Sequence, residues 1–108
     1  MDLSFYQLKA IKTAIYPNSH RVSYPAMGLG GEVGEVLNKI KKVYRDKDGI
    51  FDTVTKEDVA KELGDCLWYI AVLAHDLGQD LDKIAADNLA KLKSRQERGV
   101  LAGSGDVR

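Results

Sequence analysis

Apolar residues recur every three or four positions through most of the chain, which is the period of an amphipathic helix. No segment sustains the alternation of apolar and polar residues that a half-buried strand requires. We therefore expect an all-α fold in which residues 1–108 form a single domain. The pattern predicts four helices, over residues 3–16, 26–45, 55–78 and 80–98.

The expected helix boundaries rest on residues that start or stop helices. Pro17 should end the first helix, and residues 17–25 should form a loop. Thr55 and Asp58 have the spacing of a capping box at the start of the third helix. Gly78 suits the left-handed position that follows a helix, and Gly99 should end the fourth helix in the same way. The glycine-containing tail, residues 100–108, is expected to be flexible.

Short connections on both sides of the third helix favour antiparallel neighbours in a four-helix bundle. This helix is apolar around most of its circumference, so it should be central or pack against a second subunit. Its apolar residues on one side are Val59, Leu63, Leu67, Ile70, Leu73 and Leu77. A chain of 108 residues buries only about two-thirds of its unfolded surface. Oligomerisation would therefore complete the bundle.

Composition excludes several classes of partner. The chain has 16 basic and 16 acidic residues, so its formal net charge of zero argues against a general grip on nucleic acid. No apolar run is long enough to cross a membrane. Cys66 is the one cysteine, which excludes an internal disulfide and fits a reducing cytoplasm. We interpret Cys66 as a small core residue, not as a nucleophile.

Two predicted helices each carry a pair of acids one turn apart. Glu32 and Glu35 lie on the second helix, and Glu62 and Asp65 lie on the third. In each pair the first acid falls roughly 60° from the apolar stripe and the second roughly 120° to the same side. If the two helices pack antiparallel, the four carboxylates can converge on one edge of their interface.

These acids could be merely solvated, and Glu35 could pair with Lys39 one turn on. The third helix fits that alternative poorly, because its acidic flank contains no interleaved Lys or Arg; the flank consists of Asp58, Glu62, Asp65 and later Asp76. Like charges at this spacing repel by a few tenths of a kcal/mol per pair. A cation would relieve this repulsion, and hard oxygen ligands favour Mg²⁺, with Mn²⁺ as a substitute. Neither histidine has the Glu-x-x-His spacing of a di-iron bundle.

A row of Asn88, Lys91 and Arg95 lies on the fourth helix. Asn88 falls inside the apolar stripe, and the two bases line its edge. Such a row suits phosphate oxygens, although a bridging Asn beside two solvated bases would give the same pattern. Lys39 and Lys42 follow the acids of the second helix and are further candidates for phosphate.

The segments GLGGEVGEVLNKIKK, KELGDCLWYIA and NLAKLKSR closely resemble the MazG-like nucleoside triphosphate pyrophosphohydrolases, within the all-α NTP pyrophosphatase superfamily. The resemblance implies Mg²⁺-dependent hydrolysis of nucleoside triphosphates to a monophosphate and pyrophosphate, by attack of a metal-activated water on the α phosphate. It implies that Glu32, Glu35, Glu62 and Asp65 hold the metal. It also implies that Tyr69 and Asn88 approach the nucleotide, that Lys91 and Arg95 bind phosphate, and that the protein is a homodimer or homotetramer.

The sequence does not decide which carboxylate accepts the proton or which nucleotide is the substrate. No Ser, Cys or His has a base-and-orienter arrangement, so no covalent intermediate is expected. Glu32 or Glu35 is the expected proton acceptor for the attacking water. One alternative is hydrolysis of phosphoribosyl-ATP or another nucleotide diphosphate bond, as in the same superfamily. Another is a non-catalytic helical module that binds a metal or a partner through its acids.

Overall fold

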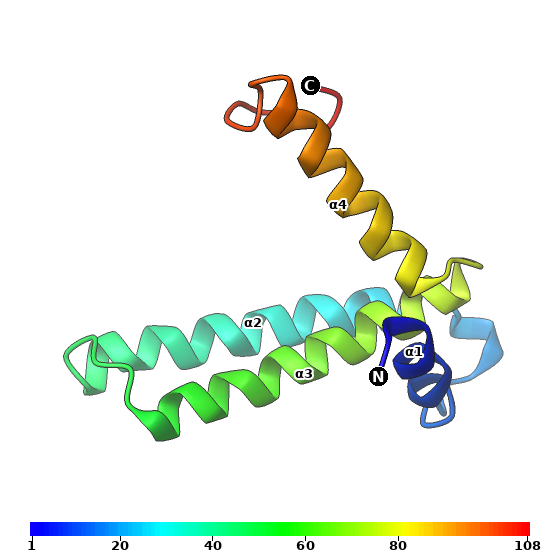
Figure 1. Cartoon of the computed structure of the whole chain (residues 1–108). Helices are drawn as coiled ribbons and strands as arrows, with labels where there is room; N and C mark the ends of the chain where they lie inside the picture. The colour runs from blue at the N-terminus through cyan, green and yellow to red at the C-terminus, as the bar shows by residue number, and fades with distance from the viewer.

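Four α-helices and one short 3₁₀ helix make up the computed structural model, which describes residues 1–108 and contains no strand (Figure 1). The predicted all-α fold and its four helices are confirmed. In chain order the elements are α1 (Leu3–Ile11), η1 (Asn18–His20), α2 (Ser23–Asp46), α3 (Thr53–Asp76) and α4 (Leu81–Glu97).

Three of the expected boundaries are wrong, each for a local reason. α1 stops at Ile11, five residues early, because the Thr13 hydroxyl turns back to donate to the Ala10 carbonyl at 2.8 Å. α2 starts at Ser23 and contains Pro25 in its first turn. Backbone N–H groups in the first turn have no acceptor within the helix, so the N–H group that proline lacks is not needed there. The start of α3 also differs from the expectation, because Asp52 is its cap.

The capping box predicted at Thr55 is absent. Instead, the Asp52 carboxylate accepts a hydrogen bond from the Thr55 backbone N–H at 2.8 Å, so α3 begins at Thr53. The two predicted glycine stops are confirmed, since Gly78 and Gly99 follow the capping residues of α3 and α4 and have φ of +71° and +70°.

α2 and α3 form a long antiparallel hairpin, and α1 packs across the end of α3 (Figure 1). The buried core is small and lies at that end, where it consists of Ala10, Ala71, Val72 and Leu81. The Gln7 side chain links α1 to the elements around this core. It donates hydrogen bonds to the carbonyls of Ala71 and Gln79 and accepts one from the Leu81 N–H. α3 is thus the central helix, as its apolar circumference predicts.

Asp76, near the end of α3, holds the connection between α1 and α2. Its carboxylate accepts hydrogen bonds from the Tyr16 hydroxyl at 2.7 Å, the Val22 N–H at 2.9 Å and Arg21 Nε at 3.3 Å. Val22 has φ of +69°, a strained value for a β-branched residue, and its bond to Asp76 helps to fix it there. Asp76 therefore has a structural role at the start of α2.

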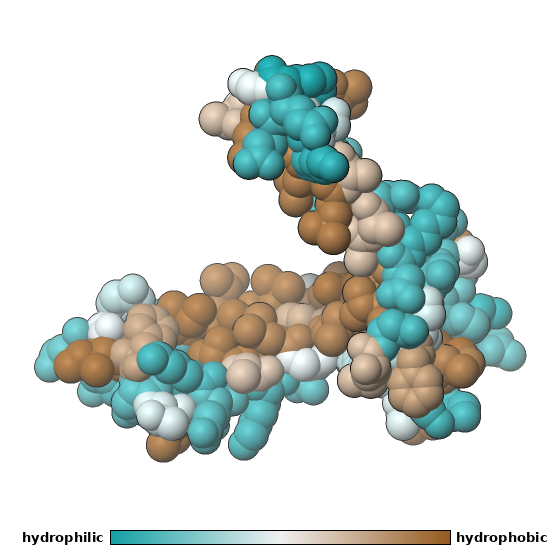
Figure 2. Space-filling model, in the orientation of Figure 1, coloured by the Kyte–Doolittle hydropathy of each residue, from teal (hydrophilic) through white to brown (hydrophobic).

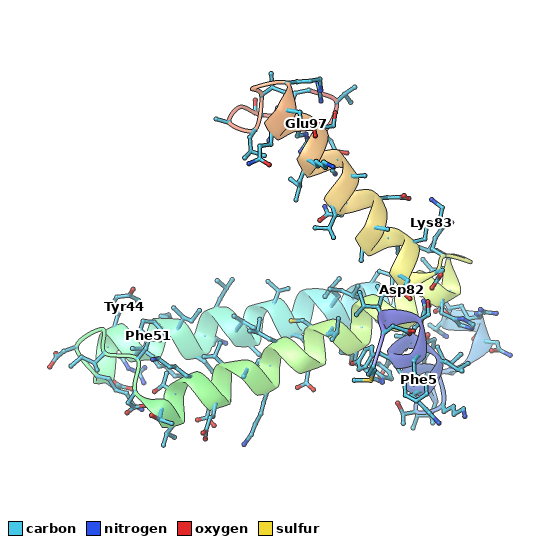
Figure 3. All side chains as sticks on the ribbon, viewed as in Figure 1. Phe5, Tyr44, Phe51, Asp82, Lys83 and Glu97 are labelled. Carbon is cyan, nitrogen blue, oxygen red and sulfur yellow. The ribbon has the colours of Figure 1, made fainter.

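α4 contacts the other helices only near its first turn and then projects away from the hairpin (Figures 1 and 3). Asp82, labelled in Figure 3, accepts a hydrogen bond from the Leu3 N–H at 3.1 Å. The radius of gyration is 16.8 Å, against about 13 Å for a compact chain of this length. The accessible surface is 7610 Å², against roughly 5,900 Å² for a compact protein of this mass.

Apolar side chains remain exposed on both arms of this open shape. Figure 2 shows a band of them along the side of the hairpin that faces α4, and more on α4 itself. The exposed apolar residues include Val33, Leu37, Leu63 and Ile70 on the hairpin and Ile84, Leu89 and Leu92 on α4. The described chain therefore leaves unburied the apolar surface that a bundle would cover. No helix is both long enough and apolar enough to cross a membrane.

Candidate metal centre and nucleotide site

The antiparallel packing of α2 and α3 brings three of the four predicted acids together. Carboxylate oxygens of Glu32, Glu62 and Asp65 all lie within 4.8 Å of one another. Glu35, one turn after Glu32, is exposed and is not part of this group. We call Glu32, Glu62 and Asp65 the acid cluster.

The acid cluster is electrostatically strained without a cation. The pKa of Glu32 is raised, first by a hydrogen bond with Glu62 and by burial, and then by the negative charges of Asp65, Glu62 and Glu35. Two carboxyl groups at such a short separation repel each other unless a proton or a cation lies between them. Three hard oxygens within such a short span suit a divalent cation such as Mg²⁺, because it replaces that proton and satisfies several carboxylates together.

Basic residues from neighbouring elements compensate part of the acidic flank of α3. Lys39 Nζ on α2 lies 3.3 Å from Glu62 Oε1, and Arg21 pairs with Asp76. The repulsion along α3 is therefore smaller than its own sequence indicates, because the compensating charges lie on other segments. Lys39, a predicted phosphate-binding residue, is in direct contact with the acid cluster.

Tyr69 lies beside the acid cluster, with its ring packed on α2 at Gly28. A Cβ added at Gly28 would lie 2.1 Å from Tyr69 Cε1, so the ring packs directly on the glycine backbone. Burial raises the pKa of Tyr69, with further contributions from Tyr24, Glu32 and Asp65. Tyr24 in turn stacks on Tyr16, with ring centroids 4.8 Å apart. An aromatic group therefore lies at one end of the acid cluster.

Cys66 is partly buried among these same groups. Burial raises the pKa of its thiol first, and the charges of Glu32, Asp65 and Glu62 raise it further. A thiol beside carboxylates is disfavoured as a thiolate, so Cys66 is a poor nucleophile. Its placement supports the interpretation that it is a packing residue, although it is less buried than a core position.

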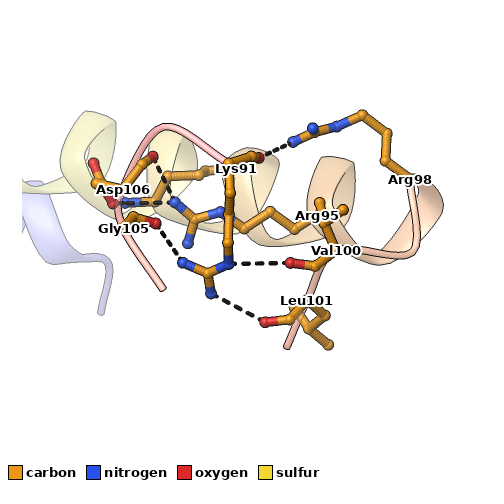
Figure 4. Close-up of polar contacts among 8 residues, drawn as sticks. Lys91, Arg95, Arg98, Val100, Leu101, Gly105 and Asp106 are labelled. Carbon is orange, nitrogen blue, oxygen red and sulfur yellow. Dashed lines mark hydrogen bonds and ion pairs between the residues drawn. The ribbon is translucent and has the colours of Figure 1, made fainter. Parts of the chain in front are cut away.

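The three predicted residues of α4 are not brought to the acid cluster within one chain. Asn88, expected in a buried stripe, is exposed because α4 packs on the hairpin only near its start. Lys91 Nζ and Arg95 Nη2 instead bind the Asp106 carboxylate, at 2.7 and 3.2 Å (Figure 4). The tail, expected to be free, thus folds back over α4.

Further hydrogen bonds secure this fold-back. The Arg108 guanidinium donates to the carbonyls of Val100, Leu101 and Gly105, and Arg98 donates to the Arg108 backbone oxygen (Figure 4). Arg95 also donates to the Asp106 carbonyl at 2.6 Å. Sequence patterns missed this arrangement because a helical period carries no information about where a glycine-containing tail folds.

Sequence reasoning also missed Gly28 as a neighbour of the site. Four glycines within residues 28–34 of a helix were a usable signal, because glycine disfavours a helix interior unless close packing requires it.

Glu32, Glu62 and Asp65 on two antiparallel helices, with Lys39 and Tyr69 beside them, form a site whose chemistry suits a divalent cation and a phosphate group. A model of the MazG nucleotide pyrophosphohydrolase domain matches residues 25–100, and the chain belongs to this family. The chain is 46% identical over 114 residues to the Gene 37 protein of Mycobacterium phage L5, with both proteins covered over their full length. No solved structure matches the chain. The predicted MazG-like resemblance is confirmed, and the class of activity is nucleotide pyrophosphate hydrolysis.

Proposed function

We propose that this protein hydrolyses nucleoside triphosphates between the α and β phosphates and releases a nucleoside monophosphate and pyrophosphate. The observation that carries the proposal is the convergence of Glu32, Glu62 and Asp65 within 4.8 Å, with Lys39 in contact with Glu62. The acids suit a metal and the lysine suits a phosphate, so the two groups together fit a metal-bound polyphosphate.

Each site residue has a distinct part in this reaction. Glu32, Glu62 and Asp65 would hold Mg²⁺, or Mn²⁺ in its place, with Glu35 approaching from the next turn. The ion, when bound, supplies charge neutralisation for the phosphates and lowers the pKa of water. Lys39 stabilises phosphate charge, and Tyr69 contacts the nucleoside.

The bonds change as follows. The oxygen of water bonds to the α phosphorus while the bridging oxygen between the α and β phosphorus atoms leaves with pyrophosphate. The proton released by water passes to a carboxylate, for which Glu32 and Glu35 are the candidates.

The open shape supports a homodimer or homotetramer as the working form. A second copy would cover the exposed apolar faces of the hairpin and α4, which leave the surface roughly 1,700 Å² larger than that of a compact protein. In such an assembly, Asn88, Lys91 and Arg95 of one copy can reach the acid cluster of another. We retain these three residues as substrate-binding candidates on that basis.

The test is pyrophosphate release from a panel of NTPs, dNTPs, damaged nucleotides and phosphoribosyl-ATP, each with and without Mg²⁺. We expect Mg²⁺-dependent release from at least one triphosphate, and ¹⁸O from labelled water in the monophosphate alone. Label in pyrophosphate would mean attack on the β phosphate. Orthophosphate as the first product, or full activity in excess chelator, would overturn the proposal.

A further inference from the structure

A cavity of about 260 Å³ lies between α2 and α3, on the side of the acid cluster away from Tyr69. Its walls include Lys39, Lys42 and Lys47, together with Thr55 and Asp58 from α3. We call it the lysine cavity. Lys39 belongs to the cavity and also contacts Glu62 of the acid cluster at 3.3 Å, so the two sites share a boundary.

The lysine cavity keeps donors available for an anion. Lys42 forms no ion pair in the structure, so its ammonium is free. Lys47 Nζ pairs with the Asp52 carboxylate at 3.3 Å and donates to the hydroxyl of the buried Thr55 at 2.8 Å. This leaves one Lys47 hydrogen and the Thr55 hydrogen to be donated elsewhere. Of the two acids in the wall, Asp46 is engaged by Arg45 at 2.7 Å, and Asp58 forms no ion pair.

One continuous seam joins the aromatic group, the acids and the lysines. Along α3 it consists of Tyr69, Asp65, Glu62, Asp58 and Thr55, which follow one another at steps of four and three residues. Steps of three and four keep side chains on one face of a helix.

The facing seam on α2 has the same spacing and runs in the opposite chain direction. It consists of Gly28, Glu32, Glu35, Lys39 and Lys42. The two helices therefore present aromatic, acidic and basic surfaces in that order along a single edge of their interface.

We propose that the lysine cavity is the subsite for the β and γ phosphates, so that the triphosphate lies lengthwise with its nucleoside at Tyr69 and its leaving pyrophosphate at Lys42 and Lys47. This subsite assignment rests on the proposed function and adds the direction in which the triphosphate lies along the hairpin. The order of surfaces along the hairpin is the order of groups in the substrate: base, α phosphate at the metal, then pyrophosphate. As the bridging oxygen leaves, negative charge develops on pyrophosphate, where the lysines stabilise it.

Lys42→Ala tests the assignment, with Lys41→Ala as a matched control, because Lys41 is the adjacent exposed lysine and does not line the cavity. Both variants of the full chain are titrated calorimetrically with inorganic pyrophosphate and with a nucleoside monophosphate, in Mg²⁺. Lys42→Ala should weaken pyrophosphate binding about tenfold, as expected for loss of one charged hydrogen bond, and leave monophosphate binding unchanged. Lys42→Arg should restore most of the affinity, and Lys41→Ala should bind both ligands like the parent chain.

Equal pyrophosphate affinities for Lys42→Ala and Lys41→Ala would overturn the subsite. Equal losses of pyrophosphate and monophosphate binding would do the same, because they would place Lys42 at the α phosphate. The proposed function fails separately, if the parent chain releases no pyrophosphate from any nucleoside triphosphate. Melting temperatures of the two variants should agree, which shows that any difference in binding is local.

Discussion

Bases line an edge of α2 and an edge of α4, and the structure gives the two rows different partners. Lys39 on α2 contacts Glu62 of the acid cluster at 3.3 Å. Lys91 and Arg95 on α4 bind Asp106 of the tail. Both rows have the same appearance in the sequence, as bases three or four residues apart at the edge of an apolar stripe.

The accessibility of the bases separates the two rows further. The Arg95 side chain is 6% exposed beneath the tail, whereas that of Lys39 is 35% exposed at the site. Arg95 can therefore contact a phosphate only after Asp106 leaves it. The Asp106 side chain is 77% exposed, whereas its partner Arg95 is buried and also donates to the Asp106 carbonyl at 2.6 Å. Within one chain the α2 row lies at the acid cluster, while the tail covers the α4 row, which lies on a helix that projects away from the hairpin.

On the hairpin, we expect the largest loss of activity when a proposed metal ligand is replaced. Asp65→Asn should reduce kcat/KM at least about 100-fold, since changes one shell further out already cost about 10- to 100-fold. The metal-free variant should melt at the same temperature or higher, because one negative charge is removed from the cluster. Steady-state pyrophosphate release and thermal unfolding with and without Mg²⁺ check both expectations.

Glu57→Gln is the matched control, because Glu57 is an exposed acid on the same helix that lies outside the acid cluster. It should retain activity and the Mg²⁺-dependent rise in melting temperature that follows from binding to the folded state. A Mg²⁺-dependent rise of the same size in Asp65→Asn would remove Asp65 from the metal site.

Periodicity and residue spacing predict the hairpin well, because its site is made of local patterns on two consecutive helices. The i, i+3 pairs at Glu32 and Glu62, and the short connection between the helices, were enough to predict that acids converge. Glu35 shows the limit of this reasoning: its angular position fits the pattern, but it remains exposed outside the cluster.

The region of α4 could not be predicted in the same way. The apolar stripe around Asn88 predicts burial, but the partner surface for that stripe is absent from a single chain, and Asn88 is exposed. The contact between Asp106 and Arg95 depends on the path of the tail through Gly103 and Gly105, whose φ values of +128° and +86° no periodic pattern indicates. The helical period determines which residues share one face of a helix, whereas tertiary packing determines which other part of the protein covers that face.

The α4 side of the comparison has an intermediate expected effect. Arg95→Ala should weaken binding of a nucleoside triphosphate about tenfold and leave nucleoside binding unchanged, because a guanidinium bonds phosphate oxygens and not the base. Lys91→Ala should act in the same direction with a smaller effect. Equilibrium binding of the two ligands to each variant measures the difference, and equal losses for both ligands would show that these residues only hold the helix and tail.

Asp106→Asn separates the two roles of Arg95. It removes the anion that competes for Lys91 and Arg95 but keeps both bases. Triphosphate binding should be unchanged or tighter, while the melting temperature falls slightly because an exposed ion pair is lost. Weaker triphosphate binding in Asp106→Asn would mean that the tail orients the bases for substrate.

The smallest expected effect lies at the aromatic end of the hairpin. Gly30→Ala should stabilise the protein by about 0.5–1 kcal/mol, because alanine has the higher helix propensity and a Cβ there meets no atom within 4 Å. Gly28→Ala gains the same propensity, but its Cβ would lie 2.1 Å from the Tyr69 ring. Overpacking of this kind costs about 1–3 kcal/mol, so the net change at Gly28 should be a destabilisation of about 1 kcal/mol.

The two glycine variants also separate packing from recognition. If Tyr69 contacts the nucleoside, Gly28→Ala moves the ring and should raise KM for the triphosphate, while pyrophosphate binding at the other end of the seam stays unchanged. Gly30→Ala should leave both constants at the parent values. Thermal unfolding, KM and pyrophosphate titration of the pair provide the comparison. An unchanged KM in a Gly28→Ala protein that is destabilised as expected would show that the Tyr69 ring packs the helices without touching the substrate.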